Sequence, residues 1–146
     1  MISNKLTAEQ VNGAKALIEK AHRIVILTHL SPDGDAMGSS LGLRHWIESI
    51  TTSKVNIVVP NPFPSFLAWM PGANDIVVYE TDTEKGNQLL AEADLAICTD
   101  FNEPKRIGSL GDQLMQENIK LLVFNILLEM FPRHMLKLKK KEFLKN

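Results

Sequence analysis

Short apolar runs that alternate with amphipathic segments constrain the fold of this chain more than any other feature. The runs are rich in β-branched residues and predict strands at residues 23–27, 54–60, 75–80, 95–99 and 120–124. The segments between them predict helices at residues 7–21, 35–50, 83–92 and 103–117. The first of these helices should begin at a capping box made by Thr7 and Gln10. Strands that alternate with helices favour an α/β fold, with a largely parallel sheet and helices on both faces.

Length and composition narrow the class of protein. The chain has 146 residues, of which 45% are hydrophobic and 23% charged, as in a globular domain with one core. No apolar run approaches the ~20 residues that cross a bilayer, and the first ten residues lack the apolar core of a signal peptide. Cys98 is the only cysteine, so no disulfide forms within one chain. We therefore expect a cytoplasmic protein with no membrane partner.

Polar side chains follow two of the predicted strands at the points where the strands end. His29, Asp33 and Asp35 come after the strand at 23–27, and Asp100 comes after the strand at 95–99. Ligands of parallel sheets gather beyond the carboxyl ends of the strands. We therefore expect these side chains to face one crevice.

One imidazole and three carboxylates in one crevice have the chemistry of a metal site. Mixed oxygen and imidazole ligands suit Mn²⁺, and Mg²⁺, Fe²⁺ and Zn²⁺ are alternatives. Two such ions would activate water for in-line attack on phosphorus, and the amino end of the following helix would favour phosphate. Gly34 is expected to let Asp33 and Asp35 point in different directions. The competing interpretation is structural, because Asp and Gly after a strand commonly form a turn and a helix N-cap.

Two longer motifs resemble those of the DHH-family phosphoesterases, a group with RecJ-type exonucleases, exopolyphosphatase-related proteins and nanoRNase/pAp phosphatases. HLSPDGDAMGSSLGL (29–43) resembles the first motif of the family, and ICTDFNEPKRIG (97–108) resembles the second. MPGANDIVVYE (70–80) looks like the sequence between them. The resemblance covers roughly residues 5–122 and implies the N-terminal part of a DHH phosphoesterase domain.

The resemblance also implies a role for each site residue. The implied ligands of manganese, with magnesium as a substitute, are His29, Asp33, Asp35 and Asp100. Asp100 would bridge two ions, and it would form the catalytic centre together with Asp35. Asn102 and Arg106 would bind the substrate, although a solvated helix face is an equal interpretation of Arg106. The implied substrate is a nucleotide or a short single-stranded oligonucleotide.

The last residues of the chain depart from the family pattern. The Asp-His-His motif that names the family should follow residues 120–124, but it does not occur there. We therefore expect the smaller C-terminal domain of the family to be absent as well. The charge balance changes from −6 over residues 1–119 to +5 over residues 120–146. We therefore expect a partial domain at 1–124 and an atypical basic tail at 125–146, for which a change of reading frame is one hypothesis.

The rival interpretation is a genuine amphipathic basic tail that binds a membrane or nucleic acid. Apolar residues fall near helical spacing in it, namely Leu127, Leu128, Phe131, Met135 and Leu138. Exposed apolar residues there would also favour association, so a homodimer is a candidate assembly.

These observations leave two functions open. The first is a metal-dependent phosphoesterase. In that case we expect this chain to have little or no activity, because it lacks part of the metal site. The second is a non-catalytic nucleotide- or phosphate-binding module.

Overall fold

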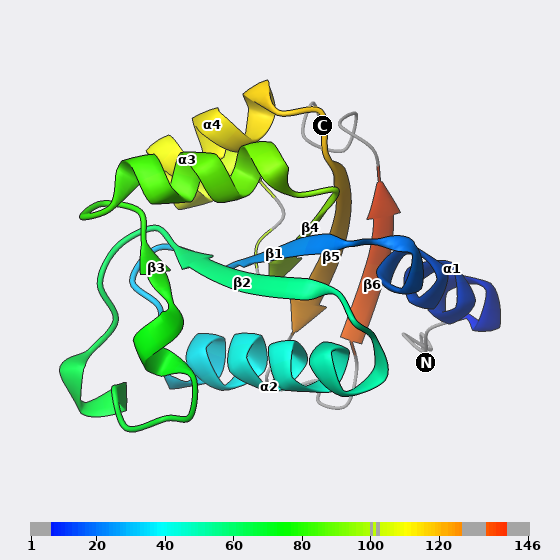
Figure 1. The fold of residues 1–146 in the computed structure, drawn as a ribbon, viewed down its shortest axis with the longest axis horizontal. Coiled ribbons are helices and arrows are strands. Elements are labelled where there is room, and N and C mark those ends of the chain that lie inside the picture. Colours follow the sequence, from blue (N-terminus) through cyan, green and yellow to red (C-terminus); the bar gives the residue numbers. More distant parts are fainter. Residues whose placement is uncertain (1–6, 100, 102, 127–133, 140–146) are drawn as a thin grey trace, which may run out of the picture.

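The computed structural model describes residues 7–99, 101, 103–126 and 134–139, and in these residues one mixed sheet organises the chain (Figure 1). Its strands are β1 (Arg23–Leu27), β2 (Lys54–Val59), β3 (Val77–Val78), β4 (Leu95–Thr99), β5 (Lys120–Ile126) and β6 (His134–Lys139). They lie in the order β3-β2-β1-β4-β5-β6. The first five are parallel, and β6 pairs with β5 in the antiparallel sense. The predicted α/β fold is confirmed.

Four α-helices cover the two faces of this sheet (Figure 1). They are α1 (Ala8–Lys20), α2 (Gly34–Ile50), α3 (Thr83–Glu92) and α4 (Ser109–Gln116). Side chains of α1 and α2 join the core on one face, and those of α3 and α4 join the core on the other. None of the helices in the described residues is long and apolar enough to cross a membrane. The capping box of α1 forms as predicted, since Thr7 Oγ1 accepts from the Gln10 amide and the Gln10 side chain accepts from the Thr7 amide.

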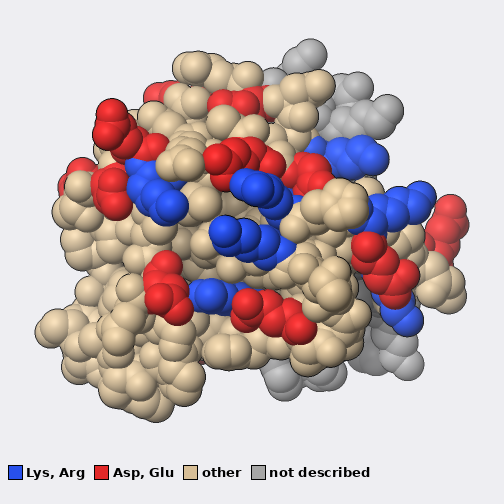
Figure 2. All heavy atoms as spheres, viewed as in Figure 1, with Lys and Arg blue, Asp and Glu red and all other residues tan. Residues whose placement is uncertain are grey.

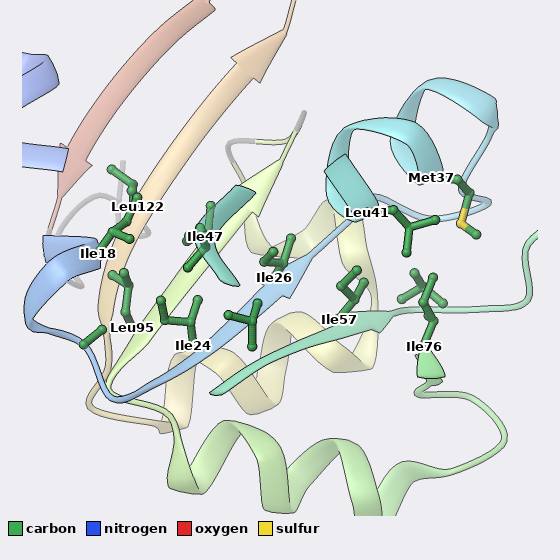
Figure 3. Close-up of a cluster of buried hydrophobic side chains, with 14 of the residues drawn as sticks. Ile18, Ile24, Ile26, Met37, Leu41, Ile47, Ile57, Ile76, Leu95 and Leu122 are labelled. Atoms are coloured by element: carbon green, nitrogen blue, oxygen red, sulfur yellow. The ribbon is translucent and has the colours of Figure 1, made fainter. Parts of the chain in front are cut away.

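The central strands are buried on both sides because successive side chains enter opposite cores. Ile24 and Ile26 of β1 join the core under α1 and α2, which Figure 3 shows together with Ile18, Met37 and Leu41. Val25 and Leu27 enter the core under α3 and α4. This arrangement explains why the β1 sequence is a continuous apolar run rather than an alternating one.

Two predicted elements are shorter in the structure than in the prediction. The strand expected at 75–80 is only Val77–Val78, because it pairs with the last two residues of β2 alone. The helix expected at 103–117 is divided into a 3-10 helix at Pro104–Ile107 and α4. The division falls at Gly108, whose φ of 62° is a conformation that glycine adopts without strain.

The tail contains a strand where its apolar spacing had allowed a helix. Residues 134–139, which include Met135 and Leu138, form β6 beside β5, so the helical interpretation is wrong for this segment. Leu127, Leu128 and Phe131 lie outside the described residues. The proposed change of reading frame stays a prediction.

Most of the connection from β2 to β3 forms a projection whose side chains are uncharged as far as Asn74; Asp75 follows just before β3. Residues 55–74 contain no Asp, Glu, Lys, Arg or His, and Figure 2 shows the corresponding uncharged surface at its lower left. Phe66 and Trp69 are each 74% exposed there. Two large exposed hydrophobic side chains on an uncharged surface make this projection a candidate binding face.

Candidate functional site

The order of the strands creates a switch point between β1 and β4. From this pair the sheet grows through β2 on one side and through β5 on the other. Leu27 of β1 lies opposite Cys98 of β4, and the buried Thr99 hydroxyl donates to the Leu27 carbonyl oxygen at 2.9 Å. The two strands therefore end side by side, at the place where open α/β sheets bind their ligands.

The β1–α2 loop, residues 28–33, begins at this edge and carries the first predicted site residues. His29 is half-buried, and its Nδ1 lies 2.7 Å from the carbonyl oxygen of Leu30. Because a carbonyl oxygen only accepts, Nδ1 donates, and in the neutral ring Nε2 then carries the lone pair. Histidines that bind metals are commonly oriented by a hydrogen bond of this kind from the other ring nitrogen.

Asp33 and Asp35 lie at the amino end of α2. Asp33 is the N-cap, and its Oδ1 accepts from the Ala36 amide at 2.9 Å. Asp33 therefore has the structural role of a helix N-cap, and this role uses one of its two carboxylate oxygens. Asp35 is exposed in the first turn, where its negative charge favours the helix dipole. Both carboxylates thus lie at the switch-point edge.

The glycine between the two aspartates does not have the role expected from the sequence. Gly34 has no positive φ, and a Cβ placed on it would meet no atom within 4 Å. The direction of the two carboxylates follows instead from the start of α2 at this point. The prediction that Gly34 is needed for their divergence is wrong, because an alanine has the space and the backbone conformation that it requires.

The segment after β4 approaches the same loop. A Cβ on Gly108 would lie 4.0 Å from Leu30 Cδ2, so the end of the Pro104–Ile107 turn adjoins the β1–α2 loop. Arg106 is exposed on this turn. The structure thus brings together the two motifs, although Leu30 and Gly108 are 78 residues apart in the sequence.

The predicted metal ligands are placed only in part. Donor chemistry fits a divalent cation, because one imidazole and two carboxylates lie at one edge of the sheet. Within the part of the chain that the structure describes, however, no three His, Cys, Asp or Glu side chains form a group that could hold an ion. Asp100 and Asn102 lie outside the described residues, so their predicted roles stay predictions.

Two residues of this edge were missed by the analysis of the sequence. Asn61, at the end of β2, contacts Ser31 in the β1–α2 loop through its Oδ1, at 2.6 Å from the Ser31 nitrogen. Thr99 ties the ends of β1 and β4 together, as described above. Contacts between distant loops leave no periodic signal in a sequence, and only the order of the strands reveals them.

Comparison with known proteins gives the family. A model of the DHH family, N-terminal domain, matches residues 23–125, which is most of the chain. The chain belongs to the DHH family. The match spans both motifs, from the start of β1 into β5, and confirms the resemblance inferred from those motifs.

Two relatives show how much of a longer protein this chain corresponds to. The bifunctional oligoribonuclease and PAP phosphatase NrnA of Thermus thermophilus is 33% identical over 84 residues, which are 58% of this chain and 23% of that protein. The crystal structure of an exopolyphosphatase-related protein from Bacteroides fragilis superposes with a TM-score of 0.80 at 39% identity. That match covers 87% of this chain and 37% of the other. The DHH chain described here therefore spans less than half the length of these relatives.

Proposed function

We propose that this DHH-family chain belongs to a phosphoesterase that hydrolyses phosphoester bonds of nucleotides or short oligonucleotides with the help of divalent cations. The observation that supports the proposal best is the position of the β1–α2 loop. It carries His29, Asp33 and Asp35 to the switch point between β1 and β4, at the amino end of a 17-residue helix. The names of the relatives support the same class of substrate, since one is an oligoribonuclease and PAP phosphatase.

Some residues of this edge would bind the metal ions, and others would bind the phosphate group of the substrate. The residues that would hold the ions are His29, Asp33, Asp35 and Asp100. Manganese is the expected metal and magnesium its substitute, and bound ions would supply Lewis acidity and activated water. The amino end of α2 would favour a phosphate group through the helix dipole. Arg106 and Asn102 would bind the same group from the segment that follows β4.

The chain by itself would supply part of such a site. No Asp-His-His follows β5 in this sequence, and the described residues bring no three ligands together. We therefore infer little or no turnover by the chain alone and weak binding of about one Mn²⁺ ion, because two carboxylates and water hold a second ion weakly. The alternative function, a phosphate- or nucleotide-binding module without catalysis, rests on the same observation.

Asp33 permits a sharp test, because its capping role and its proposed metal role can be separated. Asparagine caps a helix about as well as aspartate but lacks the charged ligand, so Asp33→Asn should keep stability and lose Mn²⁺ binding. Asp33→Ala should lose Mn²⁺ binding and should also lower the free energy of unfolding by about 1 kcal/mol. Mn²⁺ binding is measured by electron paramagnetic resonance of the remaining free ion, and stability by urea denaturation. Asp112→Asn, in the first turn of α4, is the control for loss of an exposed charge.

The same preparation distinguishes the two functions. Release of phosphate or nucleotide from pAp or a dinucleotide, measured with and without Mn²⁺, tests catalysis. Nucleotide binding without release would favour the binding module. If the unaltered chain binds neither Mn²⁺ nor nucleotide, or if Asp33→Asn binds Mn²⁺ as the unaltered chain does, the proposal is refuted.

A further inference from the structure

We propose that Asn61 is a positioning residue of the candidate site, which fixes the β1–α2 loop through Ser31. This inference rests on the proposed function. The side chain of Asn61 forms hydrogen bonds with Ser31. It would act on His29 and Asp33 through the serine that lies two residues from each of them.

Ser31 adopts a backbone conformation that its sequence disfavours. Its φ is 53°, and it is the sole non-glycine residue with a positive φ in the described part of the chain. A side chain disfavours this region, and the ring of Pro32 further restricts the residue that precedes it. Such a conformation persists only where the surrounding structure imposes it, and residues of this kind cluster at functional sites.

Asn61 supplies the contacts that can impose this conformation. Its Oδ1 accepts from the Ser31 amide at 2.6 Å, and its Nδ2 donates to the Ser31 hydroxyl at 3.4 Å. The amide group therefore holds Ser31 at two points, across 30 residues of sequence.

The chain around Asn61 is itself constrained. Pro60 and Pro62 flank it, and the Pro60 carbonyl oxygen accepts from the Glu80 amide. Proline fixes its own φ and keeps the preceding residue extended. Asn61 thus projects from a stiff segment at the end of β2, and it can hold the neighbouring loop in one conformation.

The consequence for the site is geometric. Ser31 lies at the middle of the segment between the imidazole of His29 and the carboxylate of Asp33. A change in its backbone angles would rotate these two side chains relative to each other. A residue that orients ligands in this way typically changes metal affinity about 10- to 100-fold when it is removed.

A double-mutant cycle separates positioning from the other roles that Asn61 could have. In Asn61→Ala the loop should lose its fixed conformation, and Mn²⁺ affinity should fall about 10-fold or more. Glycine adopts a positive φ without strain, so Ser31→Gly in the Asn61→Ala background should restore most of the affinity. Asn56→Ala, at the amino half of the same strand β2, is the control and should leave affinity unchanged. Hydrogen exchange of the Ser31 amide should be faster in Asn61→Ala than in the unaltered chain.

Each other outcome overturns the inference in a recognisable way. Equal Mn²⁺ affinity of the unaltered chain and Asn61→Ala would limit Asn61 to a structural role and refute the inference alone. A loss of affinity that Ser31→Gly does not restore would make Asn61 a direct ligand contact, which also refutes positioning. If the unaltered chain binds no Mn²⁺, the proposed function fails, and the inference fails with it.

Discussion

Gly86 in α3 should not tolerate alanine, although it lies within a helix. A Cβ on this residue would lie 2.5 Å from Tyr79 Cδ1 and 3.1 Å from Tyr79 Cε1. The Tyr79 ring is 5% exposed, and its hydroxyl donates to Asn87 Oδ1 at 2.7 Å. The ring therefore cannot move away without loss of packing and of this hydrogen bond. The glycine is needed for the close approach of helix and ring.

The magnitude follows from two opposing effects. Alanine in place of glycine stabilises a helix by about 1 kcal/mol. Overpacking in a core costs about 1–3 kcal/mol, and loss of the Tyr79 hydrogen bond adds about 1 kcal/mol. Gly86→Ala should therefore lower the free energy of unfolding by about 1–3 kcal/mol. For an m-value of about 2 kcal/mol/M, the urea midpoint should fall by roughly 1 M.

Gly42 of α2 is the matched control for this experiment. It is exposed, and a Cβ on it would meet no atom within 4 Å, so Gly42→Ala should raise stability by up to about 1 kcal/mol. Urea denaturation followed by circular dichroism measures both variants under one condition. If Gly86→Ala is as stable as Gly42→Ala, or if both shift in the same direction, the clash with Tyr79 does not exist in solution.

Three further predictions concern two buried side chains and one exposed surface. Burial raises the pKa of the Cys98 thiol to about 12, so a thiol reagent at neutral pH should modify the chain only after it unfolds, and rapid modification of the folded chain would contradict this. Burial likewise raises the pKa of Tyr79, the only tyrosine of the chain, so its tyrosinate absorbance should appear at higher pH in the folded than in the unfolded protein. Because the pKa of Tyr79 is higher in the folded state, neutral Tyr79 contributes fully to the free energy of unfolding below pH about 10, and this contribution falls as the pH rises further. The fall should be absent in Tyr79→Phe. Finally, if the uncharged projection mediates self-association, Phe66→Ser with Trp69→Ser should lower the sedimentation coefficient at high concentration, whereas an unchanged coefficient would exclude this surface.

The strands and helices could be predicted where the sequence itself determines them. The apolar run of β1 is needed because both of its faces are buried, and the capping box at Thr7 satisfies local amides. The sequence predicts too long a strand for β3, because its apolar run is longer than the two residues that pair with β2. The sequence predicts one helix at 103–117 because the positive φ of Gly108, which divides it, is a property of the fold and not of the local pattern.

The candidate site could be predicted as a set of residue types but not as a geometry. The sequence indicates that His29, Asp33 and Asp35 follow a strand, and the parallel sheet then places them at its carboxyl edge. Their orientation depends on contacts that no local pattern contains. The Asp33 carboxylate is turned to the Ala36 amide, and Ser31 is held by Asn61 from another loop.

Three contacts at the switch point explain how this edge can be ordered before any ligand binds. Thr99 joins the end of β4 to that of β1, Asn61 joins the end of β2 to the β1–α2 loop, and Leu30 approaches the turn that ends at Gly108. Each contact joins segments that are at least 30 residues apart in the sequence. Since the strands beneath are buried on both faces, the loop is held from several directions by rigid elements. A loop held in this way loses little conformational entropy when a ligand binds, so the unaltered chain should lose little affinity to the ordering of this loop, and removal of Asn61 should introduce that cost.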